Sequence, residues 1–173
     1  YRDVESHNMY FERAAQGRDA DELLAILASK SRDNSRTPMQ WNRGENGGFT
    51  AGEPWIALCD NYREINAEAA LADPESVFYA YQQLIALRKS TPVLTWGDYQ
   101  DLLPEHPSLW CYRRQWQGQT LVVVANLSRE FQRWQPEAMS GDWRTLMSNY
   151  AEAANRPADM TLRPFEAVWW LQE

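Results

Sequence analysis

Apolar side chains recur at helical spacing in two stretches of the first half of the chain. Asp19 and Glu22 have capping-box spacing before the first stretch, which predicts a helix from about Ala20 to Ser31. The second stretch predicts a helix that is capped by Asp73 and stopped by Pro92. Its apolar positions are Val77, Phe78, Tyr81, Leu84 and Ile85.

Short β-prone stretches replace the helical pattern after Pro92. The stretches Leu109 to Trp116 and Thr120 to Asn126 predict two strands, joined as a hairpin at Gln117-Gly118. Further strands are expected at Tyr99 to Leu103, Phe131 to Gln135, Trp143 to Met147 and Ala167 to Leu171. Strands at this spacing without helices between them favour an antiparallel sandwich.

The change of pattern divides the chain into two expected domains, residues 1–92 and residues 93–173. Trp169 and Trp170 lie in the last expected strand, where alternation places one side chain inward and the other outward. Packing in a core or between domains is the interpretation that we favour for both.

A long segment, Arg32 to Ala67, lies between the two predicted helices and is rich in Arg, Asn, Gly, Pro and Trp. Long ordered loops of this kind are usually functional. Within it we expect Arg32 and Asp33 to make hydrogen bonds that order the loop. The acidic residues Asp33, Glu53 and Glu64 are expected to be solvated or capping groups. The aromatic residues Trp41, Phe49 and Trp55 suit a sugar face, but hydrophobic anchoring of the loop is the favoured interpretation.

Composition narrows the function classes. The chain has 173 residues, 44% of them hydrophobic, and a formal net charge of -7, which disfavours nucleic acid and anionic membrane surfaces as partners. Cys59 and Cys111 lack metal-site spacing, so we expect free thiols in a reducing cytoplasm, with no metal and no cofactor. No signal peptide or membrane span is indicated, and the opening at Tyr1 is typical of the middle of a protein.

Several motifs resemble one branch of glycoside hydrolase family 13, which contains oligo-1,6-glucosidases, trehalose-6-phosphate hydrolases and sucrose isomerases. The resemblance is densest in SRDNSRTPMQW, residues 31–41, and in GGFTAGEPW, residues 47–55. YRDVES, LIALRK and LRPFEA, at residues 1–6, 84–89 and 162–167, are similar to the family in the same order. The likeness is strongest to the trehalose-6-phosphate-hydrolysing members.

The resemblance implies an α+β fragment, made of the last loop and helices of a (β/α)8 TIM barrel followed by a C-terminal antiparallel β-sandwich. A complete barrel needs about 250 residues, more than this chain holds. The implied reaction is retaining hydrolysis of trehalose 6-phosphate to glucose and glucose 6-phosphate by two carboxylates. In the family those carboxylates lie upstream of Tyr1, so we assign no catalytic residue here and expect the isolated chain to be inactive. The implied partner is the upstream barrel portion.

Arg36 is the residue that the resemblance places at the substrate, paired with an upstream Asp and with glucose hydroxyls. A planar guanidinium can hold a carboxylate and neighbouring hydroxyls in one geometry. The alternative role is an arginine that fastens the loop to backbone carbonyls. Other functions also stay open: an oligo-1,6-glucosidase, a noncatalytic carbohydrate-binding β-sandwich, or a β domain with a purely structural role.

Overall fold

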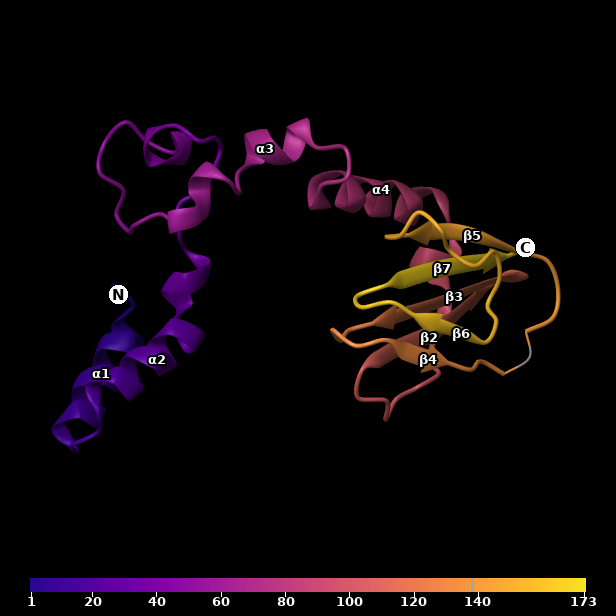
Figure 1. Ribbon diagram of the computed structural model, residues 1–173, viewed down its shortest axis with the longest axis horizontal. Helices are drawn as coiled ribbons and strands as arrows, with labels where there is room; N and C mark the ends of the chain where they lie inside the picture. The colour runs from indigo at the N-terminus through magenta and orange to yellow at the C-terminus, as the bar shows by residue number, and fades with distance from the viewer. Residues whose placement is uncertain (138) are drawn as a thin grey trace. The chain divides into compact units, whose positions relative to one another are not determined.

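The computed structural model describes residues 1–137 and 139–173 and contains two compact units, Tyr1–Tyr79 and Ala80–Glu173 (Figure 1). The helices of the first unit are α1 (Val4–Ala15), α2 (Ala20–Lys30) and α3 (Ala67–Ala72). Short 3-10 turns cover Arg32–Ser35, Glu45–Gly48 and Asp60–Arg63. Helix α4 (Val77–Ser90) begins at the end of the first unit, and α5 (Val93–Trp96) follows it. The strands are β1 (Asp98–Asp101), β2 (Leu109–Trp116), β3 (Gln119–Asn126), β4 (Gln132–Trp134), β5 (Trp143–Ser148), β6 (Met160–Leu162) and β7 (Ala167–Gln172).

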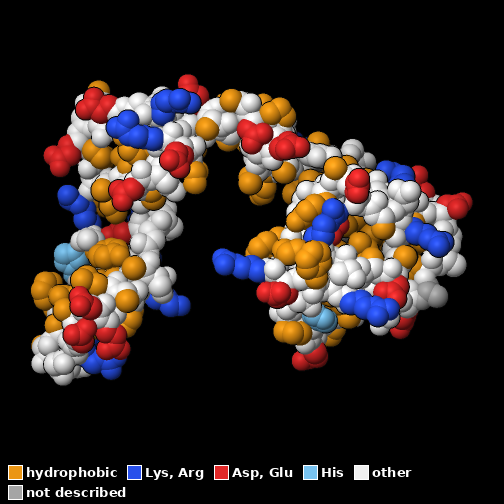
Figure 2. Space-filling model, viewed as in Figure 1, with side chains coloured by type: hydrophobic (Ala, Val, Ile, Leu, Met, Phe, Trp, Pro, Cys, Tyr) orange, Lys and Arg blue, Asp and Glu red, His pale blue; other side chains and the backbone are white. Residues whose placement is uncertain are grey.

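Helices α1 and α2 form a hairpin whose starts are fixed by side-chain caps. The Asp3 carboxylate accepts a hydrogen bond from the backbone N–H of Ser6, and the Asp19 carboxylate accepts from the second and third residues of α2. Leu23 and Leu27 of α2 are buried, while Phe11 of α1 is exposed. Figure 2 shows hydrophobic side chains on the surface of this hairpin. The predicted helix at α2 is confirmed, whereas α1 was not predicted.

The second unit is built on a five-stranded antiparallel sheet in the order β1-β2-β3-β7-β5. Strands β4 and β6 form a separate two-stranded antiparallel sheet, which lies over one face of the larger sheet in Figure 1. The predicted hairpin is confirmed, because β2 pairs with β3 in register and both turn residues, Gln117 and Gly118, have positive φ. The expected strands all form, with ends shifted by one or two residues.

Two clusters of buried side chains hold this unit together on opposite faces of the large sheet. On one face, Trp134 of β4 stacks on Trp170 of β7, with ring centroids 5.5 Å apart and an interplanar angle of 11°. On the other face, Val93 and Leu94 of α5 pack against strands β3 and β7, with Trp169 alongside. The prediction that Trp169 and Trp170 point to opposite faces is confirmed.

Helix α4 departs from its prediction at the start. Asp73 accepts the backbone N–H of Glu75 in a turn, and the helix begins only at Val77. The apolar positions Val77, Phe78, Tyr81 and Ile85 are all exposed, the first of them at 82%. In residues 1–137 and 139–173, no helix combines the length and apolar character needed to span a membrane.

Candidate functional site

A cluster of three carboxylates and two guanidinium groups joins the start of α1 to the turn after α2. The Oδ1 atom of Asp3 receives Nε of Arg32 at 3.2 Å and Nη1 of Arg36 at 3.4 Å. Nη2 of Arg32 also contacts the Glu5 carboxylate at 2.8 Å. The side chain of Asp3 is 5% exposed, so both arginines contact one oxygen of a carboxylate that is largely removed from water.

Asp33 ties the N-terminal residues to the same turn. Its Oδ2 atom accepts the backbone N–H groups of Arg2 at 2.5 Å and Asp3 at 3.0 Å. The whole residue is 3% exposed. The turn itself is set by Ser31, whose hydroxyl accepts the backbone N–H of Asp33 and lies 2.8 Å from the Ser6 hydroxyl. Serine caps of this type pre-order short helical turns.

Both buried carboxyls are held in the ionised form. For Asp33, the N–H of Arg2 lowers the pKa below its usual value, and this effect outweighs burial. For Asp3, burial alone raises the pKa, but the hydrogen bonds from Ser6 and the charges of Arg32 and Arg36 lower it overall. The cluster therefore presents fixed negative charge beside partly exposed guanidinium groups at neutral pH.

The contacts of Arg32, Asp33 and Arg36 bear on three expectations about this segment. The expected loop-ordering role of Arg32 and Asp33 is confirmed by their contacts with Asp3 and Arg2. The expectation that Asp33 is a solvated group is wrong, because it is buried and accepts two backbone N–H groups. Arg36 has a carboxylate partner within the chain, since its Nη1 lies 3.4 Å from Oδ1 of Asp3, and its pairing with an upstream Asp stays a prediction.

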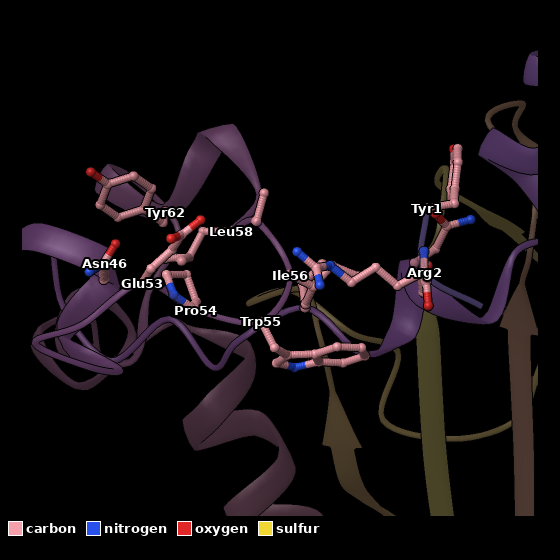
Figure 3. Close-up of a pocket in the computed structure, with 13 residues that line it drawn as sticks. Tyr1, Arg2, Asn46, Glu53, Pro54, Trp55, Ile56, Leu58 and Tyr62 are labelled. Carbon is pink, nitrogen blue, oxygen red and sulfur yellow. The ribbon is translucent and has the colours of Figure 1, made fainter. Parts of the chain in front are cut away.

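A cavity of about 660 Å³ lies beside this cluster, within the first unit. Its walls come from the chain start, from the turn after α2 and from the loop between residues 46 and 62 (Figure 3). Figure 3 shows the Arg2 side chain extended toward Ile56, with the ring of Trp55 beside it and Glu53 and Tyr62 further along the loop. The lining residues are Tyr1, Arg2, Asp33, Asn34, Thr37, Asn46, Glu53, Pro54, Trp55, Ile56, Ala57, Leu58 and Tyr62.

The aromatic residues of the loop are not its anchors. Trp41, Phe49 and Trp55 are 53%, 45% and 49% exposed, so the favoured interpretation of hydrophobic anchoring is wrong. The loop is instead fixed by backbone contacts at Gly47, whose carbonyl accepts the N–H of Trp41 at 2.8 Å. Gly47 has φ of +60°, and a Cβ there would lie 2.7 Å from Cδ2 of Leu58. Glu53 and Glu64 are exposed, as expected.

The sequence of the chain matches a known protein family. Residues 3–97, more than half of the chain, match the alpha-amylase catalytic domain. The chain belongs to the alpha-amylase family. It is 70% identical to the trehalose-6-phosphate hydrolase of Escherichia coli over all 173 residues, and this match covers 31% of that protein.

Two further members of the family show how far the likeness extends. Over 99% of the chain, the oligo-1,6-glucosidase of Halalkalibacterium halodurans is 44% identical, with 31% of that protein covered. The crystal structure of trehalose-6-phosphate hydrolase from Bacillus licheniformis aligns over 99% of this chain and 32% of its own, with TM-score 0.93 and 43% identity. The chain thus spans about a third of the length of the relatives that it matches.

Asp3, Glu5 and Arg2 are the residues of this site that sequence reasoning missed. The N-terminal motif was read only as a mark of the family, although Asp3 before Val4 and Ser6 is also a helix-cap signal. The contacts to Arg32 and Arg36 span 29 and 33 residues, and no local pattern indicates a pairing over that distance.

Proposed function

We propose that the protein containing this chain is a glycoside hydrolase that cleaves trehalose 6-phosphate to glucose and glucose 6-phosphate. The observation that carries the proposal is the 70% identity to the Escherichia coli trehalose-6-phosphate hydrolase along the entire chain. The 44% identity to an oligo-1,6-glucosidase makes hydrolysis of that enzyme's kind of substrate the alternative within the same family.

In this proposal the reaction proceeds with retention, through two carboxyl groups about 5 to 5.5 Å apart. We assign neither group to residues of this chain. The chain contributes the pocket rim, and Arg36 is its substrate-binding residue. Its side chain is 42% exposed and its Nη1 contacts Asp3, which leaves other guanidinium N–H groups to meet sugar hydroxyls.

The proposal also covers the architecture around the site. Residues 1–92 form the C-terminal end of a (β/α)8 barrel, and residues 93–173 form an all-β domain of the sandwich type. The stacking of the β4–β6 pair on the large sheet through Trp134 and Trp170 supports the sandwich. The exposed apolar side chains of α4, with Val77 at 82%, support the upstream barrel portion as the partner that covers them. The proposed location is the cytoplasm.

The test is a substrate comparison with the protein at its full natural length. Trehalose 6-phosphate, trehalose and isomaltose are supplied at equal concentration, and released glucose is measured. The proposal expects trehalose 6-phosphate to be hydrolysed with the highest kcat/KM. Faster hydrolysis of isomaltose supports the oligo-1,6-glucosidase alternative, and failure to hydrolyse any of the three refutes the assignment to glycoside hydrolysis.

A noncatalytic carbohydrate-binding role for the β domain is the second candidate. Tyr99 of β1 and Trp110 of β2 lie on either side of Tyr112, with ring centroids 5.4 and 5.1 Å from it. The rings of Tyr99 and Trp110 are about half exposed, and the indole N–H of Trp110 donates to the Tyr99 hydroxyl at 3.3 Å. Such a row suits sugar stacking. Tryptophan quenching by millimolar maltose that is abolished by Trp110→Ala supports this role, and unchanged fluorescence refutes it.

A further inference from the structure

The two carboxylate oxygens of Asp3 have different partners. Oδ2 accepts hydrogen bonds from the backbone N–H and the hydroxyl of Ser6, each at 3.1 Å, and thereby caps α1. Oδ1 accepts hydrogen bonds from Nε of Arg32 at 3.2 Å and from Nη1 of Arg36 at 3.4 Å. A helix cap needs one acceptor oxygen, so capping does not account for the contacts of Oδ1.

Arg36 depends on Asp3 more than Arg32 does. Nη2 of Arg32 has a second carboxylate partner, because Glu5 lies 2.8 Å away. The other carboxylate near Arg36 is Asp33, whose Oδ1 lies 3.8 Å from Nη1, beyond hydrogen-bonding distance. Among the residues that the structure describes, the contact with Asp3 is therefore the hydrogen bond that fixes the direction of the Arg36 guanidinium.

Burial makes Asp3 an effective anchor for this arginine. Its side chain is 5% exposed, whereas the side chain of Arg36 is 42% exposed. Water competes little for a buried carboxylate, so the contact is firmer than an ion pair on the open surface. Arg36 is thus held at one nitrogen while much of its side chain stays accessible. A donor that is already ordered loses less conformational freedom when a ligand binds.

We propose that Asp3 is the positioning residue of the substrate-binding arginine, with its Oδ1 holding Nη1 of Arg36 so that other guanidinium N–H groups are ordered for sugar hydroxyls. This inference rests on the proposed function, which it deepens by naming the residue that sets the geometry of the substrate contact. Asp3 itself touches no substrate in this account, so its removal acts through Arg36.

The experiment measures kcat and KM of the full-length protein by initial rates. The substrate is whichever of trehalose 6-phosphate, trehalose and isomaltose the wild type hydrolyses fastest, so the test does not presuppose the preference proposed above. In Asp3→Asn the amide oxygen can still cap α1, but the amide nitrogen is a donor and cannot accept from a guanidinium. We expect KM to rise about fivefold and kcat to stay within about twofold of wild type, because an ordered binding contact is lost.

Two comparisons separate positioning from folding. Asp19→Asn is the matched control, because Asp19 caps α2 through the N–H groups of Asp21 and Glu22 and, within the described residues, contacts no guanidinium group. The second comparison introduces Asp3→Asn into Arg36→Ala. If Asp3 acts through Arg36, the added substitution changes KM by less than about twofold. Asp3→Ser, which keeps a capping hydroxyl, replaces Asp3→Asn if that variant does not fold.

The proposal is supported if Asp3→Asn raises KM, Asp19→Asn does not, and the effect of Asp3→Asn disappears in Arg36→Ala. It is overturned if KM is unchanged in Asp3→Asn, if Asp19→Asn raises KM equally, if the effect persists without Arg36, or if neither Asp3 variant folds, which assigns the residue to stability alone. Thermal unfolding of each variant shows that the compared proteins are folded. A wild type that hydrolyses trehalose 6-phosphate no faster than the other two glycosides refutes the proposed function but leaves this test intact, and a wild type that hydrolyses none of them refutes both.

Discussion

Trp170 is the residue whose truncation tests the packing of the β domain most directly. It is fully buried, stacks on Trp134 with centroids 5.5 Å apart, and donates its indole N–H to the carbonyl of Ala154 at 2.6 Å. Trp170→Ala removes this contact and leaves a cavity between the two sheets. Truncations of this kind cost about 3 to 5 kcal/mol.

The cost converts into a shift of the melting temperature. For a unit of under 100 residues, 1 kcal/mol corresponds to about 4 to 8 °C, so Trp170→Ala is expected to lower Tm by about 12 °C or more. Trp116→Ala is the control, because Trp116 is 36% exposed at the end of β2 and its loss is expected to cost about 0.5 kcal/mol or less. Differential scanning calorimetry of the full-length protein resolves the two cases. If Trp170→Ala shifts Tm no further than Trp116→Ala does, the two-layer core argued above is incorrect.

Three further predictions concern the site and the end of helix α5. Arg36→Ala is expected to raise the KM for trehalose 6-phosphate about tenfold, as measured by initial rates. Arg43→Ala, at an exposed arginine of the same loop, is the control and is expected to leave KM unchanged. Equal effects of the two variants on KM would contradict a substrate contact of Arg36. Because the folded pKa of Asp33 lies below its ordinary value of 3.8, its stabilisation is complete above that value and disappears as pH falls through the lower folded pKa. Urea unfolding between pH 2 and 5 should therefore show a flatter pH dependence in Asp33→Asn, and an unaltered slope would count against this account. Gly97→Ala is expected to lower the free energy of unfolding by about 1 to 3 kcal/mol, since the new Cβ would lie 2.5 Å from the carbonyl oxygen of Val93. If thermal unfolding of the variant matches that of the wild type, the α5 turn can relax and the prediction is wrong.

The β domain was the part of the fold most accessible from the sequence. Strand β2 was predicted at its observed bounds, Leu109–Trp116, and β3 within one residue. The Gln-Gly turn between them requires positive φ, and the glycine in the sequence indicates that requirement. Strand β6 was not predicted: it has three residues, too few to show alternation, whereas β4, of the same length, lies inside the longer β-prone stretch Phe131 to Gln135.

Helix α1 shows the opposite case. Its buried residue is Ser6, and its apolar residues Val4 and Phe11 are exposed, so no apolar face of this helix is buried in the structure. The signal present was the cap at Asp3, which is short and easily overlooked. Exposed apolar residues of this kind are expected where another part of a protein packs against the helix. The sequence of this chain does not indicate which residues would cover them.

The candidate site was predictable as a segment but not as a set of contacts. Composition and family likeness both selected residues 31–41, and Asp33 was expected to be a solvated or capping group that orders the loop, but its burial was not predicted. Its burial follows from two backbone N–H groups at Arg2 and Asp3, about 30 residues away along the chain. Those two bonds use Oδ2, and Oδ1 is enclosed 3.8 Å from Nη1 of Arg36, so the same tertiary contact that orders the chain start also removes the carboxylate from water. The burial of Asp33 is therefore a tertiary effect, which the residues next to it in the sequence do not indicate.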